Sequence, residues 1–401
     1  MKIQPVKQIK NLSGKRVLLR VDFNVPIKNG RVLDDFKIQK TLPTIKYLIE
    51  KRAKVILISH LGRPKGVDKK LSLKPVAEHL EKALKQSVKF FKAERLEDYK
   101  RIKATIEQLS NGTVALLENV RFVPGEEDND PKVAKALASL ADLFVLDGFA
   151  VAHRDSASVS GVAKLLPSYA GLLLFEELSV LYKARKNPKP PLVVILGGAK
   201  VETKIPVMRE FLSKADFILV GGEIANTYWW AKGKKVGGSL VGKKFKRAVL
   251  TYCANKKVIL PVDVVVGKQD GTQARVMPVN SKFQIRDSKL AVYDVGPATV
   301  RLFAEYIKMA STLIWNGAMG KFETHPYGYG TYAVADLFAA RSRGHAFGIT
   351  GGGETVQILQ KRGILESVDL VSTGGGAMLE FLGGKELPGV KALQGKTHNR
   401  T

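Results

Sequence analysis

Short apolar runs rich in β-branched residues alternate with helical patterns along all 401 residues of the chain. In the first half we expect strands at residues 16–23, 54–61, 113–119 and 143–149, and helices near 36–53, 73–86, 100–110 and 131–141. In the second half we expect strands at residues 192–198, 217–222, 258–266, 312–317, 345–352 and 370–375. Nearly continuous apolar strands separated by helices are typical of parallel sheets covered on both faces. The predicted fold class is therefore α/β.

A chain of this length is expected to form two domains. The helical pattern over residues 168–187 is followed by Pro188, Pro190 and Pro191, which end a helix and mark a connector. We predict an N-terminal lobe over residues 1–167, an interdomain helix over 168–187 and a C-terminal lobe over 188–380. Residues 381–401 contain no complete strand–helix unit, so we expect them to pack on a domain that is already formed.

Composition narrows the functional classes. No apolar run approaches the ~20 residues that cross a bilayer, and the N-terminus has no signal-peptide core, so we expect no membrane partner. The single cysteine, Cys253, rules out an intramolecular disulfide and suits a cytoplasmic location. Its helical context favours a buried, inert thiol over a nucleophile.

The net charge is strongly positive, 65 − 37 = +28. Such a charge is compatible with nucleic-acid binding, with acidic substrates or with a generally basic proteome. The lysines are spread through nearly every helical pattern, and we find no RGG-like tail, aromatic-interleaved basic strip or zinc knuckle. We therefore expect no sequence-specific nucleic-acid partner.

The segments that follow the strands differ in chemistry between the two halves. In the first half they carry Asp22, Asn24, His60, Arg63, Arg121 and Arg154; in the second half they carry glycines, at 197–198, 221–222, 317, 320, 351–353 and 374–376. The carboxyl ends of parallel strands meet at one edge of a sheet. The first set would form a basic cup for a small polyanion, and the second a glycine-lined ledge for a phosphorylated ligand such as a nucleotide.

Each of these features has a simpler interpretation when it is taken alone. An arginine after a strand is usually a solvated loop charge, and a glycine pair after a strand is usually a turn. The repetition of one chemistry in each half is what favours two binding sites. No G-x-G-x-x-G follows the first strand, and Lys244 stands where a P-loop would need a hydroxyl, so neither of those nucleotide motifs is supported.

Eight collinear motifs resemble phosphoglycerate kinase. They are RVDFNVP (20–26), SHLGRP (59–64), LLENVRF (116–122), AHR (152–154), LGGAKVETKI (196–205), NGAMGKFE (316–323), GGGET (351–355) and STGGGAMLEFLGGKELPG (372–389). The resemblance implies two Rossmann-like lobes, each a parallel sheet covered by helices, joined by the interdomain helix and a hinge. It also implies a monomer in which the C-terminal tail, 381–401, returns to the N-terminal lobe.

The resemblance implies reversible phosphoryl transfer in glycolysis. 1,3-Bisphosphoglycerate and ADP would give 3-phosphoglycerate and Mg-ATP by direct in-line transfer after domain closure, with no protein nucleophile. Two alternatives stay open. One is a weakly active or inactive relative that retains ligand binding, and the other is a kinase fold with a side role in nucleic-acid binding, suggested only by the charge.

The matching motifs carry the family's functional positions over to this chain. The implied substrate-binding residues are Asp22, Phe23, Asn24, Lys37, His60, Leu61, Gly62, Arg63, Arg121 and Arg154. The implied nucleotide-binding residues are Gly197, Lys204, Asn316, Glu323, Gly351, Gly352, Gly353, Glu354 and Thr355. The implied catalytic residues are Lys37, Lys200, Lys204 and Gly374, and Glu354 is expected to hold the Mg²⁺ that binds with ADP or ATP.

Several positions depart from the family pattern. Lys37 stands where the family has a catalytic arginine, and Glu354 stands where it has an aspartate beside the magnesium. Ala150 replaces a glycine, Ser156 a histidine and Ala318 a proline. Because several of these changes fall at the predicted sites, they are the reason that the weakly active alternative stays open.

Overall fold

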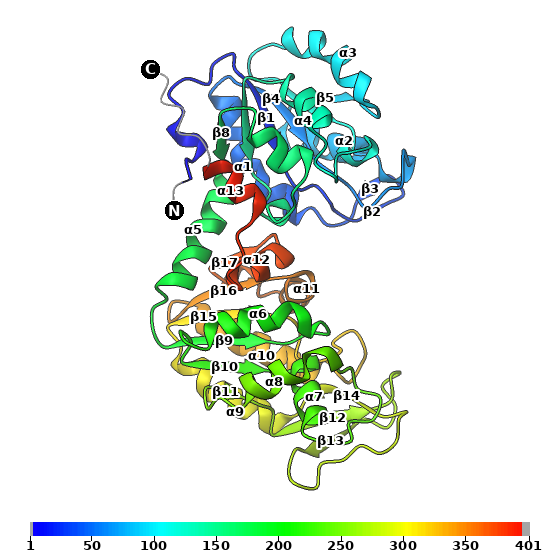
Figure 1. Cartoon of the computed structure of the whole chain (residues 1–401), viewed down its shortest axis with the longest axis vertical. Helices are drawn as coiled ribbons and strands as arrows, with labels where there is room; N and C mark the ends of the chain where they lie inside the picture. The colour runs from blue at the N-terminus through cyan, green and yellow to red at the C-terminus, as the bar shows by residue number, and fades with distance from the viewer. Residues whose placement is uncertain (1–2, 395–401) are drawn as a thin grey trace. The chain divides into compact units, whose positions relative to one another are not determined.

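The computed structural model describes residues 3–394 (Figure 1). They divide into two compact units, one formed by the chain up to Ser179 with the segment from Glu386 onward, and the other by Val180–Lys385. Within residues 3–394, no helix combines the length and the apolar character that a membrane crossing requires.

The first unit is built on a six-stranded sheet in which every pairing is parallel, in the order β5-β6-β4-β1-β7-β8. Its strands are β1 (Arg16–Arg20), β4 (Lys54–Ile58), β5 (Val88–Phe91), β6 (Val114–Leu117), β7 (Leu143–Leu146) and β8 (Ser168–Ala170), and a hairpin is formed by β2 (Ile27–Lys28) and β3 (Arg31–Val32). Its helices include α1 (Phe36–Glu50), α2 (Lys74–Leu84), α3 (Leu96–Glu107) and α4 (Pro131–Ala138). Alternate strand residues pack with the apolar faces of α1 and α2 in one buried core.

Two strands of this sheet, β5 and β8, are absent from the sequence prediction. The helix that we predict over residues 168–187 begins only at Leu172, as α5 (Leu172–Lys186). Residues 168–170 pair instead with Phe144–Leu146 of β7. Gly171 then lies against the Asp147 carboxyl with no space for a Cβ, and Leu172 N donates to Thr44 Oγ1 at 3.0 Å, which starts the helix at this point.

The second unit contains another six-stranded sheet in which every pairing is parallel, in the order β11-β10-β9-β15-β16-β17. Its strands are β9 (Leu192–Leu196), β10 (Phe217–Val220), β11 (Val258–Ile259), β15 (Thr312–Asn316), β16 (Phe347–Gly351) and β17 (Leu370–Ser372). Its helices include α6 (Val201–Phe211), α7 (Gly222–Ala231), α8 (Lys246–Cys253), α9 (Pro297–Met309), α10 (Tyr329–Ser342), α11 (Gly353–Arg362) and α12 (Gly375–Leu382). The prediction of two α/β lobes built on parallel sheets is confirmed.

The second unit also contains an antiparallel sheet that the sequence analysis missed. It has the order β13-β12-β14, with β12 (Asp263–Gly267), β13 (Arg275–Pro278) and β14 (Ala291–Val295). The single strand predicted over 258–266 is wrong, because β11 belongs to the parallel sheet and β12 to the antiparallel one. Pro261 lies between them and cannot donate a hydrogen bond to a continuous ladder.

The last described helix, α13 (Pro388–Gln394), belongs to the first unit. Gly389 N donates to Ala152 O at 2.8 Å, next to the segment that carries Arg154. Of the predicted tail, residues 381–382 end α12, and 395–401 lie outside the described residues. Cys253 is buried, and burial raises the pKa of its thiol to about 12, as expected for an inert cysteine.

Candidate active site

In the first unit, the segment after β1 and the start of α1 are joined by an ion pair. Lys37 Nζ lies 2.6 Å from Asp22 Oδ2, and Asn24 N donates to Asp22 Oδ1 at 3.1 Å. Burial alone would raise the pKa of Asp22, but the charge and hydrogen bond of Lys37, together with the charge of Arg20, outweigh it and the pKa is lowered. The carboxylate therefore stays ionised and fixes the ammonium of Lys37, which is only half-buried.

Behind this pair lies a buried arginine that the sequence analysis did not select. Arg20 is 1% exposed, and its guanidinium bonds Val21 O, Ser158 Oγ at 3.0 Å and His60 Nδ1 at 3.2 Å. Burial lowers the pKa of Arg20 to about 10. Burial also lowers the pKa of His60 well below its usual value, and Arg20 adds to this shift, so His60 is neutral at physiological pH.

The other predicted members of the cup follow β4 and β1. Phe23 N donates to Ser59 Oγ at 2.8 Å, and Gly62 N donates to Asn24 Oδ1 at 2.9 Å, so the two segments are tied together. Leu61 is buried, whereas Arg63 is exposed to solvent. The cup is thus held by a continuous set of hydrogen bonds along one edge of the sheet.

Arg121 and Arg154 meet at a hollow of about 230 Å³, which Arg20 and Ser156 also line. Two acids that the sequence analysis passed over, Glu126 and Glu127, line it as well, and Glu127 Oε1 lies 2.5 Å from the Arg121 guanidinium. Within residues 3–394, the buried atoms Arg154 Nε and Ser156 Oγ have no hydrogen-bond partner. Unpartnered buried donors are costly, which makes the hollow suited to an anionic ligand.

In the second unit, the glycines after the strands serve two different purposes. A Cβ on Gly317 would meet Gly197 O, and a Cβ on Gly375 would meet Gly352 Cα, so these glycines let neighbouring loops pack backbone to backbone. At Gly353 and Gly376, in contrast, nothing lies within 4 Å of an added Cβ. These two residues lie in the first turns of α11 and α12, where N–H groups point away from the helix and bind anions well.

Two predicted nucleotide-binding side chains brace this glycine ledge. Asn316 Nδ2 donates to Gly351 O, and Thr355 Oγ1 accepts from Gly317 N at 3.0 Å. Both side chains are buried. The structure therefore places them beneath the ledge, where they fix the backbone of the loops after β15 and β16. Gly374, the residue before α12, donates its N–H to Ser372 Oγ at 3.2 Å.

Two of the predicted charged residues of this unit, Lys204 and Glu354, lie close to Gly198. An added Cβ there would lie 3.3 Å from Glu354 Oε2 and 3.7 Å from Lys204 Nζ. Lys204 is buried and Lys200 is exposed. Burial lowers the pKa of Lys204, and the charge of Glu354 partly opposes this shift.

A pocket of about 660 Å³ opens beside these residues. Glu323 and Glu354 line it together with Gly198, and its walls include Leu240, Tyr293 and Phe322. Leu240 follows α7 and Tyr293 lies in β14, and neither belongs to one of the matching motifs, whereas Phe322 lies in NGAMGKFE (316–323). The pocket's mixture of an apolar wall, glycine backbone and one polar end fits a nucleotide.

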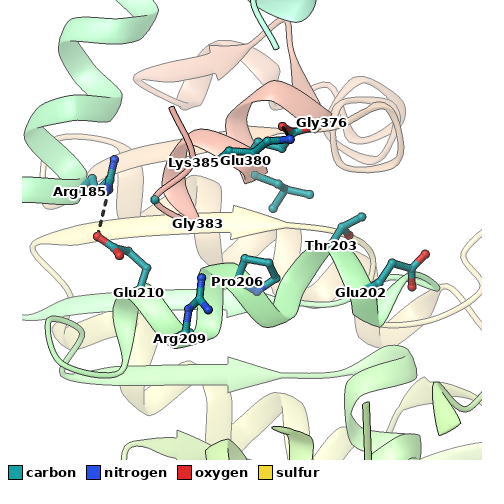
Figure 2. Close-up of a pocket in the computed structure, with 12 residues that line it drawn as sticks. Arg185, Glu202, Thr203, Pro206, Arg209, Glu210, Gly376, Glu380, Gly383 and Lys385 are labelled. Atoms are coloured by element: carbon teal, nitrogen blue, oxygen red, sulfur yellow. Dashed lines mark hydrogen bonds and ion pairs between the residues drawn. The ribbon is translucent and has the colours of Figure 1, made fainter. Parts of the chain in front are cut away.

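A second hollow of about 660 Å³ lies between α6 and α12 (Figure 2). Thr203 and Gly376 line it next to the glycine ledge, and Arg185 bonds Glu210 at 3.0 Å farther along. Lys385 pairs with Glu380 at 2.6 Å. Its three cations, Arg185, Arg209 and Lys385, are matched by Glu202, Glu210 and Glu380.

Comparison with known proteins places this geometry in a family. The family model described as phosphoglycerate kinase matches residues 6–385. The phosphoglycerate kinase of Pelotomaculum thermopropionicum is 45% identical to this chain, and the alignment covers 96% of this chain and 98% of the relative. The phosphoglycerate kinase of Pseudothermotoga lettingae is also 45% identical, and its alignment covers 99% of this chain and 100% of the relative.

Solved structures agree with the sequence relatives. The structure of phosphoglycerate kinase from Coxiella burnetii superposes with a TM-score of 0.84 at 38% identity, and that from Pyrococcus horikoshii with 0.83 at 32%. Each alignment covers 98% of both chains. With both strand-end sites lying inside the matched residues, this chain belongs to the phosphoglycerate kinase family.

Proposed function

We propose that this chain is an active phosphoglycerate kinase, which moves a phosphoryl group reversibly between 1,3-bisphosphoglycerate and ADP in glycolysis. The observation that carries the proposal is the family match over residues 6–385, which spans both the basic cup and the glycine ledge. A coupled assay with 3-phosphoglycerate and Mg-ATP, with the acyl phosphate trapped as a hydroxamate, tests it. Absence of turnover with both ligands still bound would favour a relative that has lost catalysis.

The cup of the first unit binds 3-phosphoglycerate or 1,3-bisphosphoglycerate. Arg121 and Arg154 offer forked donors to phosphate or carboxylate oxygens, and Arg63 lies exposed nearby in the chain segment after β4. Neutral His60, fixed by Arg20, keeps one ring nitrogen for the ligand. Asp22 and Asn24 hold the hydroxyl end, with Phe23, Leu61 and Gly62 shaping the wall.

The pocket of the second unit binds ADP or ATP. The ribose hydroxyls bond Glu323, and the phosphates follow the backbone from Gly197 and Gly198 to Gly351, Gly352 and Gly353. The open N-terminal turns of α11 and α12 face the phosphates, with Gly374 at the second turn. Lys204 and Lys200 neutralise the charge of the transferring group.

The metal is expected to arrive with the nucleotide. Within residues 3–394, no group of three or more His, Cys, Asp or Glu side chains forms a metal site. Glu354 is an exposed carboxylate beside Lys204 at the pocket, and Mg²⁺ is usually held by one or two carboxylates together with substrate phosphates and water. The donor set fits such an ion, which would neutralise phosphate charge and orient the phosphates. The protein would act as a cytoplasmic monomer.

Arg154→Ala and Arg121→Ala are each expected to weaken 3-phosphoglycerate binding by about 10-fold or more, since each removes charge-assisted hydrogen bonds to the ligand. ADP affinity should change by less than about twofold, because both arginines belong to the first unit. Isothermal titration calorimetry of each ligand measures this, with the exposed Lys46→Ala variant as a matched loss of charge. Equal losses for both ligands would contradict the assignment of the cup.

Glu354→Gln is expected to raise the Mg²⁺ concentration needed for ADP binding by about 10-fold, because an amide is a poor ligand for this ion. The affinity for 3-phosphoglycerate should not change. Calorimetric titration of ADP at several Mg²⁺ concentrations measures the effect, with Glu366→Gln as an exposed control. An unchanged Mg²⁺ dependence would show that Glu354 only stabilises the start of α11.

A further inference from the structure

One exposed face of the second unit has a charge unlike the rest of the chain. Residues 224–262 contain nine lysines and arginines and no aspartate or glutamate. The segment includes most of α7, the loop after it, and α8, and these two helices lie side by side (Figure 1). We call the surface formed by the C-terminal end of α7, residues 232–247 and α8 the α7–α8 face.

Exposed cations gather where the two helices meet. Lys232, Lys243, Lys244, Lys246 and Arg247 are all exposed. Within residues 3–394, none of them takes part in an ion pair. Gly242 N donates to Thr227 Oγ1 at 2.9 Å, which holds the start of this basic run against α7.

Aromatic rings lie directly beneath these cations. Lys246 Nζ is 5.7 Å from the centre of the Trp230 ring, and Lys232 Nζ is 6.0 Å from that of Tyr228. Both rings are half-buried and pack on a core that contains Trp229 and Phe283, so they are held rigidly. This arrangement is not visible in the sequence, because the packing of α8 against α7 brings Lys246 to Trp230, sixteen residues earlier in the chain.

We propose that the α7–α8 face binds single-stranded nucleic acid without sequence preference. Phosphates would lie on the cations, and bases would stack on the two rings. Lysine stems are flexible, so an ammonium group that now covers a ring can move to a phosphate and leave the ring face to a base. This combination of free positive charge and rigid aromatic faces is the one that single-strand binding proteins use.

Single-stranded nucleic acid and an anionic membrane would contact different side chains of the α7–α8 face. Adsorption to a membrane draws on apolar side chains that project beyond the cations into the headgroup layer. Trp230 and Tyr228 instead lie half-buried beneath lysines. They can meet a flat base that approaches between the ammonium groups, so nucleic acid is the partner that the geometry favours.

The test uses the full chain and a fluorescent 15-nucleotide oligo(dT), with binding followed by anisotropy from low to moderate salt. In a variant with Lys243→Gln, Lys244→Gln, Lys246→Gln and Arg247→Gln, affinity at 0.1 M salt should fall by about 100-fold or more. The slope of log affinity against log salt should become shallower by about 3, at roughly 0.7 per lost phosphate contact. None of these residues lines either candidate site, so kcat for phosphoryl transfer should stay unchanged and report correct folding.

A matched variant removes four exposed cations of the first unit, Lys82, Lys85, Lys89 and Lys100, where acids are interspersed. Its affinity for oligo(dT) should stay within about threefold of that of the parent protein. If both variants lose affinity equally, the attraction comes from the total charge of the protein and the α7–α8 face is not a site.

The stacking of bases on the Trp230 and Tyr228 rings is tested with the parent protein. An abasic strand of the same length should bind about 10-fold more weakly than oligo(dT). Of the three tryptophans, Trp229 and Trp315 are buried, so quenching of intrinsic fluorescence by the bases would report on Trp230. Equal binding of the abasic strand without quenching would overturn the proposal. The proposal would also be wrong if the quadruple variant lost binding to phosphatidylserine vesicles but kept its affinity for oligo(dT).

Discussion

Lys37→Ala is expected to lower kcat for phosphoryl transfer by about 10²-fold or more, with smaller changes in the Michaelis constants. The scale is that of removing one preorganised donor from a charged transition state. Lys37 Nζ is held 2.6 Å from the buried Asp22 carboxylate, so its charge is fixed in place before the substrate binds. Removing it also raises the pKa of Asp22, because burial then acts on that carboxyl without the opposing charge and hydrogen bond of Lys37.

The neighbouring Lys40 supplies the control. It lies on the same helix, is exposed, and contacts the Phe36 ring instead of an acid, so Lys40→Ala should leave kcat within about twofold. Lys37→Arg should retain or improve activity, since a guanidinium can keep the Asp22 contact and add a forked donor. Steady-state kinetics at saturating Mg-ATP and 3-phosphoglycerate distinguishes these outcomes. If Lys37→Ala turned over at the parent rate, another residue would have to supply the catalytic cation, and Lys204 would be the first candidate.

The sequence alone predicted the parts of the fold that depend on hydrophobic periodicity. Strand β9 is apolar at every position and β1 at its three central positions, as is typical of a sheet that is covered on both faces. The predicted strands nevertheless extend past their observed ends, because residues such as Asp22 are buried by the site and not by strand pairing. β8 could not be predicted, since its three residues take their conformation from β7 and lie directly before a helix.

In the candidate site, too, some features could be predicted from the sequence and others are visible only in the structure. The sequence could place Arg121 and Arg154 at one edge because they follow strands of one parallel sheet, and the structure brings both to one hollow. Arg20 was not, because it lies within β1, and only the fold shows that it points to His60 and Ser158. The glycines looked alike in the sequence, yet Gly317 serves loop packing and Gly353 is open. That difference depends on the distance between two loops, which no local pattern contains.

The two predicted catalytic lysines of the second unit, Lys200 and Lys204, differ in burial. Lys204 is 7% exposed and its ammonium lies 3.2 Å from Thr203 Oγ1, whereas Lys200 is exposed at the start of α6. A cation that is already desolvated needs little reorganisation when phosphate arrives, so its interaction with developing charge is stronger than that of a hydrated one. The stronger contribution to the transition state should therefore come from Lys204.

Lys204→Ala is expected to lower kcat/KM for Mg-ATP by about 10²–10³-fold, and Lys200→Ala by distinctly less. Burial lowers the pKa of Lys204, so the parent should lose activity as the pH rises through that lowered pKa, earlier than an ordinary lysine would allow. The residual activity of Lys204→Ala should lack this alkaline decline, whereas Lys200→Ala should keep it. The measurement is a pH profile of kcat/KM for the three proteins, with urea unfolding to verify that each is folded. A larger loss in Lys200→Ala, or an alkaline decline that persists in Lys204→Ala, would show that the buried ammonium is not the group that meets the transferring phosphoryl.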